Sequence, residues 1–135
     1  MSKINQYNEK GQPHDLWKYY YPNGQLSSMG TYIKGKEHGL WEFYWYNGQI
    51  ICKGTYANGK EHGLWENYSN GKLCNKGTYA NGKEHGLWEY YYSNGKLCYK
   101  GTYVNGQHHG LWKFYYPDGK IKKQVFHSKH LYEQE

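Results

Sequence analysis

Histidines recur at a fixed position along this chain, where they could bind a metal ion or titrate near neutral pH. One stands three residues before each of five tryptophans: His14, His38, His62, His85 and His109. Equivalent histidines on successive hairpins should lie roughly 10 Å apart, whereas the ligands of one ion lie within about 4 Å of each other. We therefore expect residues that pack at strand entries, and no metal site.

A glutamate precedes three of these histidines, in the runs Lys36-Glu37-His38, Lys60-Glu61-His62 and Lys83-Glu84-His85. General acid–base catalysis needs such groups to converge in a pocket, but a repeat spreads them along an edge. The chain shows neither a nucleophile motif nor a phosphate-binding loop. We expect a protein that is not an enzyme and needs no cofactor.

These residues belong to a unit that recurs along nearly the whole chain. Its tryptophans stand at intervals of 24, 24, 23 and 24 residues, at Trp17, Trp41, Trp65, Trp88 and Trp112. Nine turn signals, mostly Asn-Gly, separate runs rich in Tyr, Trp, Phe, Thr and Ile. Asn-Gly favours the type I′ turn of a two-residue hairpin. The pattern predicts an all-β fold: a single-layer, elongated, twisted antiparallel β-meander of about five two-stranded repeats.

Folding the chain at Asn94-Gly95 predicts the register of one hairpin. Trp88 then faces Gly101, which leaves room for the ring, and Glu89 faces Lys100. Near the turn, Tyr91 faces Cys98 and Tyr92 faces Leu97. The same fold at Asn47-Gly48 pairs Trp41 with Gly54 and Glu42 with Lys53. One face therefore carries Trp and Tyr, and the other carries Glu and Lys.

The copy that contains Trp65 is one residue short before its Asn70-Gly71 turn. Direct pairing would turn its tryptophan to the wrong face, so we predict a β-bulge near Cys74–Lys76 that restores the register. Cys74 and Cys98 share their repeat position with Ser27 and Ile51. A position that accepts all three residue types indicates packing and not redox chemistry.

Composition limits the partners. The net charge is +6 and all 17 cations are lysines, so the bidentate guanidinium that reads guanine or phosphate is missing. The lysines lie opposite the aromatic face and are offered glutamate partners, which argues against nucleic acid. Three cysteines without Cys-x-x-Cys spacing, no signal peptide and no apolar run long enough to span a membrane predict a cytoplasmic protein with reduced thiols.

The repeat predicts three segments. Residues 1–13 form a degenerate N-terminal cap, residues 14–121 form the array, and residues 122–135 form a capping strand followed by a polar tail. Atypical terminal repeats protect the open edges of such sheets.

The residues Gly-x-x-x-x-Gly-x-x-x-Gly-x-Trp-x-x-Tyr, as in Gly77 to Tyr90, resemble the MORN repeat, and most closely its Trp-containing variant, which is associated with antitoxin components. The resemblance covers about residues 11–125 and implies a single-layer sheet in which aromatic rings pack on glycines of a neighbouring strand. It implies a protein-interaction scaffold, antitoxin- or immunity-like, without catalytic residues. Similar arrays occur in bacteria and giant viruses. The resemblance therefore also allows a viral host-interaction protein, located in the host cytoplasm or in the virion.

The expected function is protein–protein interaction, because a single sheet cannot bury both faces and large apolar strips mark partner sites. The partner is another protein or a second copy in a homodimer. The residues expected to line the strip are Trp41, Tyr44, Trp45, Trp65, Trp88, Tyr90, Tyr92 and Trp112. The alternative is a membrane-surface protein that its lysines recruit to anionic lipid.

Overall fold

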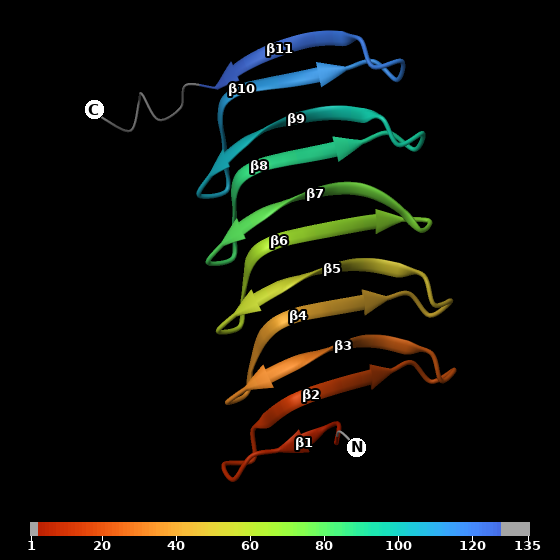
Figure 1. Ribbon diagram of the computed structural model, residues 1–135, viewed down its shortest axis with the longest axis vertical. Helices are drawn as coiled ribbons and strands as arrows, with labels where there is room; N and C mark the ends of the chain where they lie inside the picture. The colour runs from red at the N-terminus through yellow and green to blue at the C-terminus, as the bar shows by residue number, and fades with distance from the viewer. Residues whose placement is uncertain (1–2, 128–135) are drawn as a thin grey trace, which may run out of the picture.

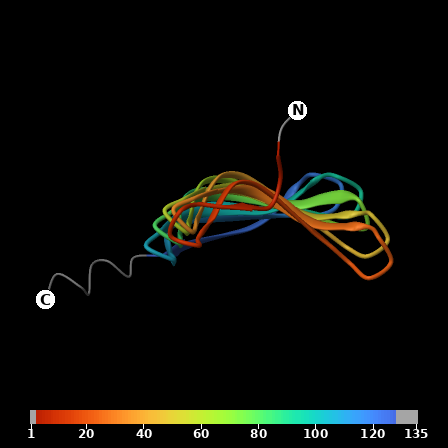
Figure 2. The ribbon, with the colours of Figure 1, turned by 90° about the horizontal axis from the view of Figure 1, so that it is seen from below.

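A computed structural model of the chain describes residues 3–127 and shows one sheet of eleven strands. Each strand pairs antiparallel with the next in sequence, so the sheet is a meander (Figure 1). Figure 2 shows a single twisted layer, and no other described element covers either face. The all-β meander predicted from the repeat is confirmed. The strands are β1 Gln6–Tyr7, β2 Pro13–Tyr20, β3 Leu26–Ile33, β4 Lys36–Tyr44, β5 Ile50–Ala57, β6 Lys60–Ser69, β7 Lys72–Ala80, β8 Lys83–Tyr91, β9 Leu97–Val104, β10 Gln107–Tyr115 and β11 Ile121–His127.

Two kinds of turn alternate along the chain. The turns Lys34-Gly35, Asn58-Gly59, Asn81-Gly82 and Asn105-Gly106 have positive φ at both residues, as the type I′ prediction requires. The turns at Gly24, Gly48, Gly95 and Gly119 have positive φ at the glycine alone. At the third of these, Gly95 N–H donates to the Tyr92 carbonyl at 2.9 Å, and Tyr92 N–H donates to the Lys96 carbonyl. This is a three-residue loop with a type I turn, so the two-residue prediction was wrong there.

Each hairpin closed by this second kind of turn also contains a bulge. These turns all lie at the same edge of the array. In β8–β9, Tyr90 pairs with Tyr99 but Tyr91 pairs with Leu97, which leaves Cys98 as the extra residue. The predicted pairs Tyr91–Cys98 and Tyr92–Leu97 were therefore wrong, while Trp88–Gly101 and Glu89–Lys100 are confirmed. One additional loop residue and one bulged residue cancel, because each shifts the pairing by one. The extra residue of each bulge stands at the repeat position that the sequence analysis found to accept Ser, Ile and Cys. The bulged residues are Ser27, Ile51, Cys74, Cys98 and Lys122.

The short copy keeps the bulge and loses the loop residue. Asn67 pairs with Asn75 and Tyr68 with Leu73, so Cys74 bulges as predicted. Its Asn70-Gly71 turn has only two residues, both with positive φ. This bulge is thus common to the hairpins that turn at Gly24, Gly48, Gly71, Gly95 and Gly119, and the missing residue shortens the Asn70-Gly71 turn instead.

A second irregularity recurs where the even-numbered strands meet the preceding strand. Between β3 and β4, Gly30 pairs with Trp41 but Thr31 pairs with His38, which leaves Gly39 and Leu40 as extra residues. The glycine at this place has positive φ in every copy from β4 to β10. In β2 the same position is Asp15, at φ 65°, a conformation that costs a non-glycine residue about 1–2 kcal/mol.

The two faces of the sheet carry different side chains. We call the side with the five repeat tryptophans the Trp face, and the opposite side the Glu–Lys face. The cross-strand pairs Trp41–Gly54 and Glu42–Lys53 lie on these respective faces, as the fold at Asn47-Gly48 predicted. The N-terminal segment contributes β1, whose Tyr7 packs edge-on against Trp17 at 5.1 Å. The C-terminal segment contributes β11, and the predicted tail at 128–135 lies outside the described residues.

Candidate functional site

The repeat tryptophans form the core of this single-layer sheet. Their exposed fractions run from 0% at Trp112 to 8% at Trp17. Tyrosines alternate with them edge-on along the Trp face: Tyr56 lies between Trp41 at 6.2 Å and Trp65 at 5.1 Å. Edge-to-face pairs contribute about 0.5–1.5 kcal/mol beyond the area they bury. The Trp face therefore supplies the packing that most domains obtain from a second layer.

Each indole also closes a gap in the backbone ladder. The indole N–H of Trp65 donates to the Thr55 carbonyl at 2.8 Å, and Trp41, Trp88 and Trp112 donate likewise to the threonine carbonyls of their preceding strands. The extra Gly-Leu residues interrupt strand pairing at these threonines. The threonine hydroxyl in turn donates to a histidine carbonyl, as in Thr55 to His62. Buried backbone groups are thereby satisfied where the bulge has removed their strand partners.

The structure does not bring the eight predicted partner residues into one exposed strip. Four of them are the buried tryptophans Trp41, Trp65, Trp88 and Trp112. Tyr44 lies on the opposite face, where its pairing with Ile50 and its interaction with Glu42 place it. Trp45 is 49% exposed in a turn. Tyr90 is half-buried on the Trp face, and the Tyr92 hydroxyl donates to the Tyr115 carbonyl at the turn edge. Their partner role stays a prediction, but the expected aromatic strip is closed off by the sheet's own packing.

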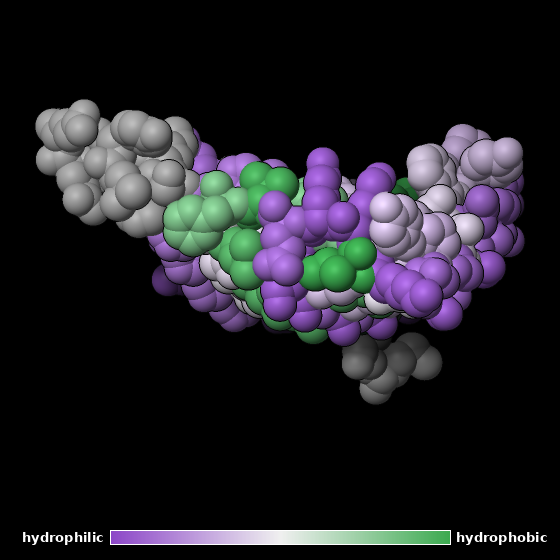
Figure 3. Space-filling model, turned by 90° about the horizontal axis from the view of Figure 1, so that it is seen from above, coloured by the Kyte–Doolittle hydropathy of each residue, from purple (hydrophilic) through white to green (hydrophobic). Residues whose placement is uncertain are grey.

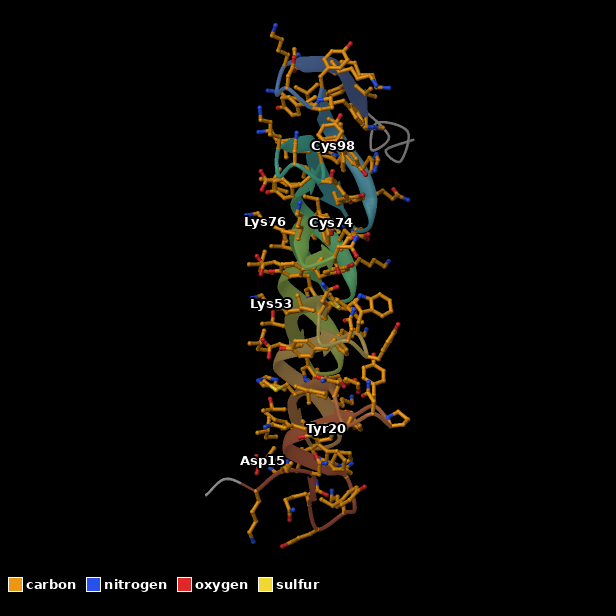
Figure 4. All side chains as sticks on the ribbon, turned by 90° about the vertical axis from the view of Figure 1, so that its right-hand side faces the viewer. Asp15, Tyr20, Lys53, Cys74, Lys76 and Cys98 are labelled. Carbon is orange, nitrogen blue, oxygen red and sulfur yellow. The ribbon has the colours of Figure 1, made fainter. Side chains whose placement is uncertain are left out.

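Opposite charges alternate across the Glu–Lys face. Successive strands from β4 to β9 place in register Glu42, Lys53, Glu66, Lys76, Glu89 and Lys100. Figure 4 shows Lys53 and Lys76 projecting from the same side of the ribbon. Lys53 Nζ lies 3.8 Å from Glu66 Oε1. Tyr68 and Tyr91 donate to Glu66 and Glu89. Burial, together with these carboxylates, raises the pKa of both tyrosines.

A row of exposed leucines runs beside these charges. Leu40, Leu64, Leu87 and Leu111 are the second residues of the Gly-Leu bulges, and 44–54% of each is exposed. Leu40 pairs with Thr55 in the same ladder as Glu42–Lys53, which fixes it on the Glu–Lys face. The sequence analysis did not single these residues out. A signal was present in the sequence, because Gly-Leu-Trp recurs in the copies from Trp41 to Trp112. Its leucine stands next to the tryptophan, at a position of the opposite face, where a polar residue would be expected.

The regularly spaced histidines do not converge. Among residues 3–127, no group of three or more His, Cys, Asp or Glu side chains is placed to hold a metal ion. His14 lies 3.6 Å from Asp15 at the surface. No helix of the described part is long and apolar enough to cross a membrane.

A cavity of about 330 Å³ opens beside the short turn. Elsewhere on this edge, adjacent turns are joined: Asn23 Nδ2 donates to the Tyr46 carbonyl and Asn94 Nδ2 to the Pro117 carbonyl. At the short turn, the Lys72 ammonium donates to the Ser93 carbonyl at 3.2 Å instead. Cys74 and Tyr92 are among the lining residues, and Figure 4 shows Cys74 and Cys98 one above the other along the array. The cavity follows from the missing loop residue.

The C-terminal end of the array exposes mixed side chains. Figure 3 shows hydrophilic and hydrophobic residues interspersed at this end. Phe126 and Ile121 of β11 are exposed, and Lys123 Nζ lies 5.0 Å from the ring centroid of Phe114. Lysines on an edge strand discourage pairing with another chain.

Comparison with known proteins identifies the repeat. A family model described as MORN repeat variant matches five times, at residues 16–34, 37–58, 61–81, 84–105 and 109–129. No curated protein matches this chain. Among solved structures it is similar to TarM of S. aureus, a mutant in complex with Fondaparinux, alpha-GlcNAc-glycerol and UDP, with 13% identity and a TM-score of 0.46 over 65% of this chain and 18% of that one.

A second TarM structure matches with 14% identity and a TM-score of 0.45, over 67% of this chain and 18% of that one. The chain thus spans less than a fifth of the length of these solved proteins.

The five family matches include both strands of each hairpin from β2 to β11. The chain belongs to the MORN repeat variant family.

Proposed function

We propose that this protein is a non-enzymatic interaction scaffold that docks a second copy of itself through its Glu–Lys face. The observation that carries the proposal is the leucine row, which leaves four large apolar side chains exposed at equivalent positions. Rows of exposed apolar side chains with a polar rim mark protein contacts. The buried tryptophans move the expected docking surface from the aromatic face to the opposite one.

The charge order favours a second copy as the occupant. The sequence Glu42, Lys53, Glu66, Lys76, Glu89, Lys100 has the opposite sign at every place when it is read backwards. A two-fold axis parallel to the strands, between β6 and β7, reverses the strand order of the second copy. Glu66 then faces Lys76 of the second copy, and Glu89 faces its Lys53. Complementary charge of this kind fixes register and excludes other partners.

The same axis also places the leucines suitably. Rotation about an axis parallel to the strands keeps the position along each strand, so the leucine row faces the leucine row. The leucines lie on even-numbered strands only, and reversal sets β4 opposite β9. Leu40, Leu64 and Leu87 therefore each enter between two leucines of the second copy, and Leu111 lies beside one. Both rows meet themselves, as a two-fold symmetric interface requires.

Sedimentation equilibrium on the full chain tests this proposal. We expect a dimer in the wild type, and a dissociation constant at least tenfold weaker for Leu64→Asp and for Glu66→Lys. The pair Glu66→Lys with Lys76→Glu restores complementarity at the centre of the interface, so it should recover much of the lost affinity. Tyr46→Asp, at an exposed turn, is the matched control and should dimerise like the wild type.

A wild-type monomer at high micromolar concentration would overturn the self-association proposal, as would loss of the dimer in Tyr46→Asp. Failure of the double charge swap to recover any affinity would contradict the proposed register. Flotation with anionic vesicles addresses the membrane alternative, and salt-sensitive binding that competes with dimerisation would favour lipid as the occupant. The antitoxin-like role implied by the variant repeats would require a toxin to displace the second copy from this face.

A further inference from the structure

The last repeat carries a histidine where the others carry glutamate. His108 occupies the position of Glu37, Glu61 and Glu84, which pair with ladder tyrosines on the Trp face. Its ring stacks on Trp112, with centroids 4.0 Å apart and planes at 20°. It also meets Tyr103 edge-on at 5.0 Å. Because Trp112 is fully buried, its rigid surface fixes the plane of the imidazole.

A second histidine, on the final strand, points at the first. His127 of β11 packs edge-on to His108, with centroids 4.8 Å apart and planes at 82°. His108 Nδ1 lies 3.4 Å from His127 Nε2. One of these nitrogens carries the hydrogen and the other accepts it, so the in-plane directions of both nitrogens converge on the space between the rings.

We propose that His108 and His127 form a two-histidine site for a borderline divalent cation such as Zn²⁺, Ni²⁺ or Cu²⁺. A Zn–N bond is about 2.0–2.1 Å, and two ligands at a tetrahedral angle are then about 3.4 Å apart. The observed separation of the two nitrogens matches this value. On binding, the ring that donates the hydrogen passes it through water to its other nitrogen, so that both neutral imidazoles present a lone pair. The cation then lies beside the line that joins the two nitrogens, and their separation is kept.

The surrounding groups suit a solvent-open site. Trp112 and Tyr103 supply one wall, and the exposed side of His108 faces solvent. No third His, Cys, Asp or Glu side chain joins the pair among residues 3–127, so water completes the coordination. Imidazole nitrogen selects Zn²⁺, Ni²⁺ and Cu²⁺ over Mg²⁺ and Ca²⁺, which prefer oxygen.

The expected effect is to fasten the edge strand. Within residues 3–127, β11 pairs on one side only, with β10. A cation between His108 and His127 adds a cross-strand bond at the end of this pairing, where Gly110 faces His127. Backbone amides of β11 should therefore exchange more slowly when the cation is bound.

Calorimetric titration of the full chain with ZnCl₂ and NiCl₂ tests the site. We expect one strong binding event in the wild type and at least a tenfold loss of affinity in both His108→Gln and His127→Gln. The double variant should lose no more than either single one, because one ligand alone does not chelate. His62→Gln, a repeat histidine on an exposed surface, is the matched control and should bind like the wild type. MgCl₂ should give no binding heat.

Electron paramagnetic resonance of the Cu²⁺-loaded wild type gives a readout that does not depend on the folding of any variant. Hyperfine splitting from two nitrogens is expected. Absence of binding in the wild type, equal weakening by His62→Gln, or a signal from a single nitrogen would each overturn the proposal. Hydrogen exchange on the same sample should show added protection in β11, and unchanged exchange there would contradict the proposed bridge.

Discussion

The indole ring of Trp88 lies over Gly77 of the preceding strand, although Trp88 also pairs in register with Gly101 of the following one. A Cβ atom at position 77 would fall 2.0 Å from Trp88 Cδ2. Gly101 is covered in its turn by Trp112. Every repeat is therefore joined to the one before it by a ring seated on a glycine, and the array is continuous because each unit closes its predecessor.

Replacing Gly77 with alanine should destabilise the whole array. The new methyl group overlaps the indole, and neither the ring nor the strand can move without losing the hydrogen bond from Trp88 to the Thr78 carbonyl. Overpacking of a core usually costs about 1–3 kcal/mol, and more where relief is blocked. Urea unfolding followed by far-UV circular dichroism measures the change.

The partner substitution separates overlap from other effects of the added methyl group. Trp88→Leu alone removes the ring and should destabilise through the lost packing. In the double variant, Gly77→Ala with Trp88→Leu, the methyl group has room. The combined loss of unfolding free energy should therefore be smaller than the sum of the two single losses. Simple additivity would show that the ring does not set the need for glycine at this position.

The first repeat keeps a residue that its own conformation disfavours. Asp15 has φ 65° where the later copies have glycine, and its contact with His14 is exposed and contributes little. Asp15→Gly relieves about 1–2 kcal/mol of left-handed strain against a smaller entropy cost. We expect a net gain of about 0.5–1 kcal/mol, measured by urea unfolding.

The reverse change provides the matched variant. Gly110 has φ 70° and nothing within 4 Å of an added Cβ, so Gly110→Asp recreates the Asp15 geometry without a clash. It should lose stability by a similar amount. If both changes were neutral, the left-handed position would carry no strain in this family of bulges.

Much of the fold could be read from the sequence, because the turn signals and the Trp period act locally. The Trp88–Gly101 register was predicted correctly although the loop and the bulge near it were not, since each adds one residue and they cancel. A signal for the longer loop was present in Pro22 and Pro117, which precede Asn23-Gly24 and Asp118-Gly119. Proline favours the first central position of a type I turn. Which glycine a ring covers was not readable, because both glycines stand in register with it.

The candidate site was less predictable because burial depends on neighbouring strands. Pairing placed Trp88 on one face, but nothing in the pairing indicated that Tyr79 and Tyr103 would enclose it edge-on. The leucine row was hidden for a different reason. Leu87 reaches the opposite face through a two-residue bulge that no turn signal marks. The histidine pair lies outside the regular histidine positions, so a search by repeat position passed over it.

Restoring the missing loop residue should stabilise the short repeat. Insertion of a tyrosine between Tyr68 and Ser69 copies the order Tyr91-Tyr92-Ser93 of the next repeat and leaves the Cys74 bulge unchanged. The inserted hydroxyl can donate to the Tyr91 carbonyl, as the Tyr92 hydroxyl does to the Tyr115 carbonyl at 2.5 Å. One further turn-to-turn bond from Asn70 becomes available, and each such bond contributes about 0.5–1.5 kcal/mol.

Urea unfolding and near-UV circular dichroism of this insertion variant, with a glycine inserted at the same place as control, decide the outcome. The tyrosine should fill the cavity and raise stability, whereas the glycine should restore the loop length with little gain. A large loss with either residue would mean that the two-residue turn is required for the register of Trp65 and Gly77.

Alkaline pH should unfold the array by ionising the tyrosines that alternate with the tryptophans on the Trp face, such as Tyr56 and Tyr79. Burial, reinforced by Glu61 and Glu37, raises the pKa of Tyr56 to about 12, and burial likewise raises that of Tyr79. Tyrosine in the unfolded chain titrates near 10. Above that pH the unfolded state loses protons that these tyrosines retain in the folded sheet. This contribution to stability is therefore complete below about pH 10 and is lost as the pH rises toward 12.

Parallel measurement of tyrosinate absorbance at 295 nm and far-UV circular dichroism should show ionisation and loss of the sheet together. Tyr56→Phe removes one such proton, so its stability should fall less steeply over the same interval. Ionisation of these tyrosines near pH 10 in an intact sheet would contradict the role assigned to their burial between the tryptophans.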